Sequence, residues 1–114
     1  MNNIEYQTRQ LIRELKKSNI YNQYRRLQMK IKKDPELYKR VNEFRGLCFA
    51  IQNKPDGPGD TGQLYGLYEA YNDILMNSDV REMLSAEHGM SIMMNQVMEQ
   101  IYSNLDIDVS FLDY

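Results

Sequence analysis

The sequence predicts an all-α protein of four to five helices. Apolar residues recur at steps of three and four along most of the chain, which places them on one face of an α-helix. No strong strand pattern appears before the last nine residues. With 114 residues, of which 42% are hydrophobic and 26% charged, the chain has the size and composition of a single globular domain, expected over residues 1–114.

Two helices are expected in the first third of the chain, over residues 4–17 and 20–33. They are separated at Ser18-Asn19, where the apolar pattern is interrupted. The second helix carries apolar residues at i, i+4, i+7 and i+11, a narrow stripe with the 3.6-residue period. The stripes are Ile4, Leu11, Ile12 and Leu15 in the first helix and Ile20, Tyr24, Leu27 and Ile31 in the second.

Asp34-Pro35 predicts the start of a third helix, over residues 35–53. Asp accepts hydrogen bonds from free backbone N–H groups, and Pro at the first helical position loses no bond that would have formed. Cys48, the single cysteine, falls in the middle of the apolar arc. Since a free cysteine often behaves as a small buried hydrophobe, a packing role is expected for it. The arc comprises Leu37, Val41, Phe44, Cys48 and Ile51.

A turn is expected over residues 54–62, KPDGPGDTG, which hold two of the three prolines and three of the six glycines. This segment lacks the Lys-Ser/Thr ending of a phosphate-binding loop and the ligand spacing of a calcium loop, so a plain turn is favoured. A tyrosine-rich helix follows over residues 63–76. Its stripe consists of Leu64, Tyr68, Tyr71 and Leu75.

The last helix is expected over residues 79–105, after a cap signal at Asn77-Ser78-Asp79. Its apolar residues alternate three- and four-residue steps, which is typical of knobs-into-holes packing against an antiparallel neighbour or a second subunit. The hypothesis is a long antiparallel hairpin of 35–53 and 79–105 within an oligomeric helical bundle, a homodimer or higher oligomer. The predicted interface residues are Val80, Met83, Met90, Met94, Val97 and Ile101. The tail 106–114, DIDVSFLDY, could be a short strand, a docking peptide or a frayed end.

Charge is divided unevenly along the chain. Residues 1–54 hold 13 Lys and Arg against 5 Asp and Glu, whereas residues 55–114 hold 1 against 11. A net charge of +8 is thus followed by one of −10. This favours two halves that attract each other, within a subunit or between subunits, and Glu87 in the last helix could pair with a base from the first half. The alternative is that the basic half binds nucleic acid.

Four residues mark the possible face for RNA or an acidic partner: Arg25, Arg26, Lys30 and Lys33. Nearby tyrosines could stack on bases, and RNA binding through this face would weaken steeply with salt. The basic residues are spread around the helix, however, so a solvated face that the acidic half partly neutralises is the favoured interpretation.

The sequence shows no arrangement typical of an enzyme. His88 is the single histidine, and no Ser/His/Asp, Cys/His or close carboxylate pair meets the geometric requirements of an active site. No catalytic residue, cofactor or metal is therefore expected. One cysteine cannot close an internal disulfide, and no stretch approaches the roughly 20 apolar residues of a membrane span. A cytoplasmic location without membrane contact is expected.

Two segments, DPELYKRVNEFR and NSDVREMLSAE, each combine a helix cap with a continuing apolar stripe. Separated by the Gly/Pro turn and LYGLYEAYNDIL, they resemble the YlbF/YmcA family of small helical bacterial proteins, over roughly residues 4 to 105. The resemblance implies a cytoplasmic, non-enzymatic regulator linked to competence, sporulation and biofilm formation. It also implies a helical hairpin that assembles into oligomers.

The resemblance further implies partners. Some family members act together as a complex that influences RNase Y and messenger RNA maturation, so paralogous family members and RNase Y are candidate partners. Certain relatives in that complex bind iron–sulfur clusters through several cysteines. Cys48 alone does not supply the cysteine ligands that a cluster requires, so no cluster is expected, and this departure argues against direct membership of the complex.

Overall fold

The computed structural model describes residues 2–53, 61–108 and 110, and in this part of the chain it is helical, with no strand. The all-α prediction is confirmed. The helices are α1 (Asn3–Lys17), α2 (Asn19–Lys32), α3 (Pro35–Gln52), α4 (Thr61–Ala70), α5 (Asn72–Leu75) and α6 (Ser78–Asn104). None of them has both the length and the apolar character needed to span a membrane.

The two predicted cap signals, at Asp34 and Asn77, are confirmed, and Asn2 and Ser18 cap α1 and α2 in the same way. The side-chain oxygens of Asn2, Ser18, Asp34 and Asn77 accept hydrogen bonds of 2.8–3.2 Å from backbone N–H groups two or three residues later. Each bond satisfies a donor that the first turn of a helix leaves free. The interruption predicted at Ser18 is therefore the N-cap of α2, and α1 and α2 are separate helices.

The helix expected over residues 63–76 is instead divided at Tyr71 into α4 and α5. The Tyr71 ring lies 5.6 Å from the Phe44 ring, measured between centroids, and the Arg40 guanidinium lies 4.9 Å from the Tyr71 ring centroid. The break turns Ile74 into the core, where it is almost fully buried. Tertiary packing has overridden a helical pattern that is continuous in sequence.

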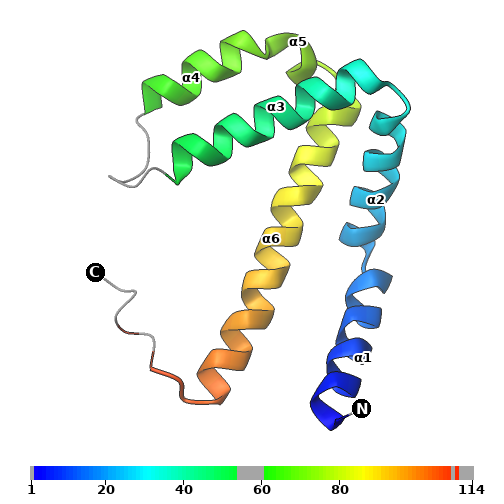
Figure 1. The fold of residues 1–114 in the computed structure, drawn as a ribbon, viewed down its shortest axis with the longest axis vertical. Coiled ribbons are helices and arrows are strands. Elements are labelled where there is room, and N and C mark those ends of the chain that lie inside the picture. Colours follow the sequence, from blue (N-terminus) through cyan, green and yellow to red (C-terminus); the bar gives the residue numbers. More distant parts are fainter. Residues whose placement is uncertain (1, 54–60, 109, 111–114) are drawn as a thin grey trace.

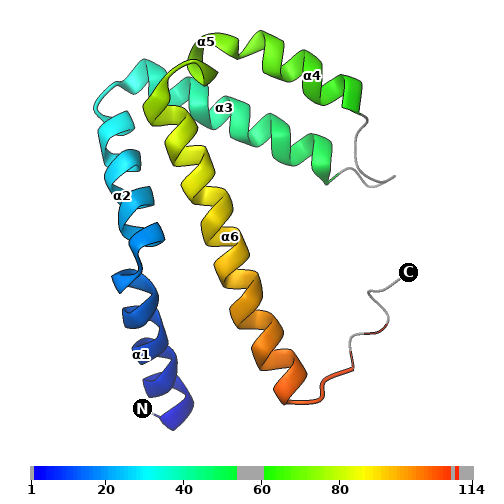
Figure 2. The ribbon, with the colours of Figure 1, turned by 180° about the vertical axis from the view of Figure 1, so that it is seen from behind.

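The helices form two arms that meet at one end (Figure 1). In the first arm α1 and α2 follow one another, and α6 runs antiparallel beside α2. In the second arm α3 and α4 lie side by side, pointing away from α6 (Figure 2). The predicted hairpin of 35–53 and 79–105 is not confirmed, because the turn at Asp34-Pro35 directs α3 away and leaves α2 as the main neighbour of α6.

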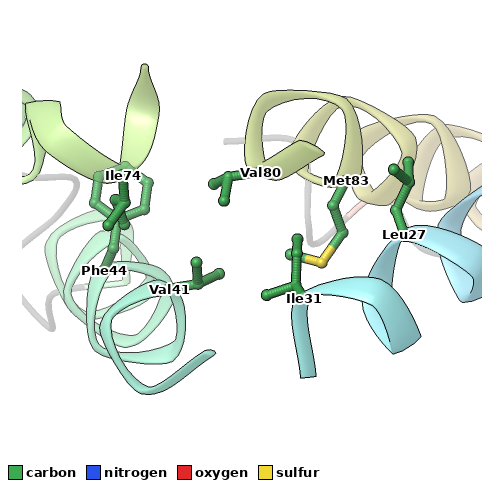
Figure 3. Close-up of a cluster of buried hydrophobic side chains, with 7 residues drawn as sticks. All are labelled: Leu27, Ile31, Val41, Phe44, Ile74, Val80 and Met83. Atoms are coloured by element: carbon green, nitrogen blue, oxygen red, sulfur yellow. The ribbon is translucent and has the colours of Figure 1, made fainter. Parts of the chain in front are cut away.

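The core lies where the two arms meet (Figure 3). Its members are at most 5% exposed and come from four helices. They are Leu27 and Ile31 of α2, Val41 and Phe44 of α3, Ile74 of α5, and Val80 and Met83 of α6. By contrast, α1 has no buried residue, and the buried residues of α6 end at Ala86. The far ends of α1 and α6 thus lie beyond the core.

Two predicted segments lie partly outside the described residues. The Gly/Pro turn is described only from residue 61 onward, and the tail only at residues 106–108 and 110. Asp106 has a left-handed backbone conformation, with φ of 55°. The Ile107 N–H donates to the Tyr102 carbonyl at 3.3 Å, so the chain turns directly after α6.

Candidate interaction surfaces

Among the described residues, three ion pairs join the basic half of the chain to the acidic half. In each, a base from residues 1–54 meets an acid from residues 55–114, and the N···O distance is 2.6–3.1 Å. The pairs are Lys30–Asp79, Arg40–Asp73 and Arg45–Glu87. All are partly exposed, so each contributes at most about 1 kcal/mol to stability. They support the interpretation that the two halves attract each other within one chain.

The predicted partnership of Glu87 with a base is confirmed. Both nitrogens on one side of the Arg45 guanidinium face the carboxylate, with Nη2 at 2.8 Å from Oε2 and Nε at 3.3 Å from Oε1. Only the Nε–Oε1 contact is a hydrogen bond, because Oε2 is within ion-pair distance of Nη2 but has no hydrogen-bond partner. The pair connects α3 to α6. The negative charge of Glu87, which lies on the apolar stripe of α6, is thus paired with the positive charge of Arg45.

The predicted basic face lies on α2 and its C-cap. Lys30 is occupied by Asp79, and Arg25 Nη1 donates to Gln28 Oε1 at 2.6 Å. Arg26 and Lys33 are exposed. Half of the predicted face is thus engaged in contacts within its own chain.

The six predicted interface residues of α6 differ in how deeply they are buried. Val80 and Met83 are buried in the chain's own core, where they hold α6 against its neighbours. Met90 and Val97 are half-buried, whereas Met94 and Ile101 are exposed. Only the later members of the stripe are therefore available to another molecule.

An open apolar stripe runs along the far ends of α1 and α6. Its side chains are 39–78% exposed, which is unusual for so many large hydrophobic residues on one surface. They are Ile4, Leu11 and Ile12 of α1, and Met94, Met98, Ile101 and Leu105 of α6. A groove of about 460 Å³ separates the two helices, lined by Leu11 on one side and by Val97, Ile101 and Leu105 on the other.

A second hollow, of about 790 Å³, opens between the two arms. Phe44, Cys48 and Phe49 of α3 line it together with Tyr68 of α4, and the Arg45–Glu87 pair also lies on its wall. Phe49 is exposed, as are Leu47 and Tyr65 nearby in the same arm.

The sequence interpretation did not include this arm among its candidate surfaces. The available signal was the pair Leu47 and Phe49, which lie beside the apolar arc of α3 and make that helix apolar over more than one face.

Cys48 lies half-buried in the wall of this hollow, as expected for a packing residue. Burial raises the pKa of its thiol above the ordinary value, because the charged thiolate is poorly solvated there. A raised pKa lowers the fraction of reactive thiolate at neutral pH. This environment does not activate Cys48 as a nucleophile.

We therefore expect Cys48 to react slowly with a thiol reagent such as iodoacetamide. At pH 8 the folded chain should be alkylated several-fold more slowly than the same chain unfolded in urea, since thiolate is the reacting form. Mass spectrometry over time measures both rates. Equal rates in the two states would contradict the half-buried position.

The described residues hold no cluster of metal-ligating side chains. No group of three or more His, Cys, Asp or Glu side chains in this part of the chain could hold a metal ion. His88 is exposed on α6. The candidate functional features are thus the open apolar stripe and the hollow between the arms, both suited to protein contact.

Comparison with known proteins gives a family match over nearly the whole chain. The family model described as "Control of competence regulator ComK, YlbF/YmcA" matches residues 4–106. A relative from Halothermothrix orenii named UPF0342 protein is 28% identical over 103 residues, covering 89% of this chain and 87% of the relative. A relative of the same name from Caldicellulosiruptor bescii is 26% identical over 106 residues, covering 91% and 86%. No solved structure matches the chain significantly.

Proposed function

Because the chain belongs to the YlbF/YmcA family, we propose that it is a non-enzymatic regulatory protein that acts through protein–protein contacts. The family's description links it to control of the competence regulator ComK. The observation that carries the proposal is the open apolar stripe, seven large hydrophobic side chains exposed on two neighbouring helices. Three of them, Leu11, Ile101 and Leu105, line one groove, and exposed apolar surface of this kind is typical of protein interaction sites.

In its finer form, the proposal is an adaptor in RNA processing or developmental control. The family resemblance supplies this part, with paralogous family members and RNase Y as candidate partners. The structure supports the general mode of action, since the open apolar stripe faces outward and the hollow presents the exposed Phe49 beside polar side chains. A surface of this chemistry binds apolar protein segments better than it binds a polar metabolite.

The test is a pull-down of tagged protein from native lysate, with and without ribonuclease, followed by mass spectrometry. We expect protein partners to remain after ribonuclease treatment, because apolar contacts do not depend on RNA. A chain in which Ile101 is replaced by Glu should lose partners that bind the open apolar stripe. Loss of every partner on ribonuclease treatment would overturn the proposal.

The second candidate is an RNA-binding module, favoured by the exposed cations Arg26 and Lys33 on the basic half. Phosphate contacts from such residues bind nucleic acid with little sequence preference. Reversing the charge at Arg25 and Arg26 would then weaken binding to all RNA sequences alike, as measured by filter binding at several salt concentrations. The intrachain pair Lys30–Asp79 weighs against this candidate, because it neutralises part of the same face.

A further inference from the structure

Two hollows on the inner side of the arms share part of their walls. The hollow of about 790 Å³ between the arms and a second one of about 440 Å³ between α2 and α6 are both lined by Glu87 and Ser91. Met98 follows Ser91 after seven residues, about two helical turns, so it continues the same face of α6 toward the end of the helix. These residues form one surface, the inner track. It consists of Tyr24 of α2, Phe49 of α3, and Glu87, Ser91, Met94 and Met98 of α6.

The inner track leaves large apolar side chains in water. Phe49 is 68% exposed, and Met94 and Met98 are 41% and 43% exposed. The charge on the track is already paired, because Glu87 contacts Arg45. Removal of apolar surface from water is favourable. A segment that reaches the inner track with apolar side chains therefore gains free energy by covering it.

The tail of the chain leaves α6 on the side of the inner track. Directly after the helix the chain turns, since the Ile107 N–H donates to the Tyr102 carbonyl at 3.3 Å. Residues 106–108 then lie on the same side of α6 as the second arm and away from α1 (Figure 1 and Figure 2). The groove that Leu11 lines opens toward α1, whereas the inner track opens toward the second arm. The tail is thus directed toward the inner track.

The tail is also long enough to follow the inner track. Six residues come after Asp108, and an extended chain advances roughly 3.3 Å per residue, so they span about 20 Å. From Leu105 back to Ser91, α6 rises about 21 Å at roughly 1.5 Å per residue. On the same scale Phe111 comes level with Met98. The tail therefore reaches the edge of the hollow between the arms.

We propose that the tail of this chain, residues 109–114, folds back along the inner track and covers it as a strap. Of the three alternatives for the tail, this is the docking peptide, with its docking site in its own chain. In an extended segment alternate side chains point to one side, so Val109 and Phe111 face the track together. Because the tail is tethered at the end of the track, its effective concentration is on the order of millimolar, and a weak contact suffices.

Charge complementarity supports the same occupant. Residues 106–114 hold three acids and no base: Asp106, Asp108 and Asp113. Arg25 lies at the rim of the inner track, since its Nη1 donates to Gln28 Oε1 at 2.6 Å and Gln28 Nε2 donates to the Tyr24 hydroxyl at 3.4 Å. Gln28 is neutral, so this contact leaves the charge of Arg25 unneutralised. An acidic tail is therefore attracted to the track that its apolar residues cover.

The strap regulates part of the surface that binds partners. Met94 and Met98 belong both to the inner track and to the open apolar stripe. A partner that binds there has to displace the tail, so its apparent affinity falls in proportion to the fraction of chains in which the track is open. This regulatory part of the inference rests on the proposed function, whereas the position of the tail does not.

The test is oxidation by hydrogen peroxide, measured for each methionine by mass spectrometry of peptides. Peroxide oxidises exposed methionine sulfur faster than covered sulfur. A strap that is bound for roughly two-thirds of the time slows the reaction about threefold, so a chain that ends at Asp108 should oxidise Met94 and Met98 about threefold faster than the full chain. Met29 and Met76 are the matched controls, since they are exposed outside the inner track, and their rates should not change.

A second variant keeps the tail and changes only its apolar residues. Phe111→Ser combined with Leu112→Ser should expose Met94 and Met98 as the truncation does, whereas Ser110→Ala should leave the rates of the full chain unchanged. Circular dichroism establishes that each variant remains helical. Equal rates at Met94 and Met98 in the full and truncated chains overturn the inference. Protection that disappears on dilution also overturns it, because the covering tail then belongs to a second copy.

The outcome is separate from that of the pull-down. If the tail protects the two methionines but the chain recovers no partner after ribonuclease treatment, the proposed function alone is overturned. If the methionines are unprotected and partners are still recovered, only the strap is overturned. Where both stand, the truncated chain should recover more of the partners that bind the open apolar stripe than the full chain does.

Discussion

Replacing Leu27 by Ala is expected to lower the free energy of unfolding by about 2–5 kcal/mol, the range of large-to-small substitutions in a packed core. Leu27 is fully buried at the place where α2 packs against α6, and it belongs to a core of few members. Removal of its side chain loses apolar burial and leaves a cavity that neighbours fill only in part. Small domains have total stabilities of roughly 5–15 kcal/mol, so this one change removes a large share.

Urea unfolding followed by circular dichroism measures the effect. Met29→Ala on the same helix is the matched control, because Met29 is exposed, and its change should be within about 0.5 kcal/mol. The midpoint for Leu27→Ala should fall while the dependence on urea stays the same, which separates lost stability from a change in the unfolded state. Similar midpoints for the two variants would contradict the placement of the core at Leu27. If the chain dimerises, all midpoints must be compared at one protein concentration.

Features that depend on neighbouring residues could be predicted from the sequence. The starts of α3 and α6 are set by Asp34-Pro35 and by Asn77. The Asp34 and Asn77 side chains accept hydrogen bonds from backbone N–H groups two or three residues later. Helix bounds followed from such local contacts. The break at Tyr71 could not be predicted in this way: Tyr71 packs against Phe44, which lies 27 positions earlier in the chain, so its surroundings are not visible in the local sequence.

Local sequence patterns also could not predict which helix packs beside α6. Both α2 and α3 carry apolar stripes of the correct period, so periodicity alone offers two neighbours for α6. The choice depends on the direction in which α3 leaves the turn at Asp34-Pro35.

The same limit applies to the interface residues. Val80 and Ile101 occupy equivalent positions in the heptad pattern, yet one is in the core and the other is exposed. Charge was more informative, since Glu87 on the apolar stripe required a partner, and Arg45 supplies it.

A larger residue at Gly89 is expected to separate α2 from α6. A Cβ atom placed on Gly89 would lie 2.8 Å from Cδ1 of Ile20, closer than real Cβ contacts come. Gly89→Ala adds a single methyl group against the flexible end of Ile20, which can turn aside. Gly89→Leu instead inserts a whole side chain between the helices, and overpacking of this kind costs about 1–3 kcal/mol. The better helix propensity of Leu over Gly offsets roughly 1 kcal/mol of that cost.

Compensation at Ile20 distinguishes this contact from a general effect of the substitution. In the double variant Gly89→Leu/Ile20→Ala the new side chain fills the space that Ile20 leaves, so part of the lost stability should return. Residues in direct contact show such coupling energies, whereas distant ones add. Gly66→Leu on α4 is the control, because a Cβ there would meet nothing within 4 Å, and it should be neutral or stabilising. If Gly89→Leu is as harmless as Gly66→Leu, then α2 and α6 do not approach at Gly89, and the first arm is more open than the structure places it.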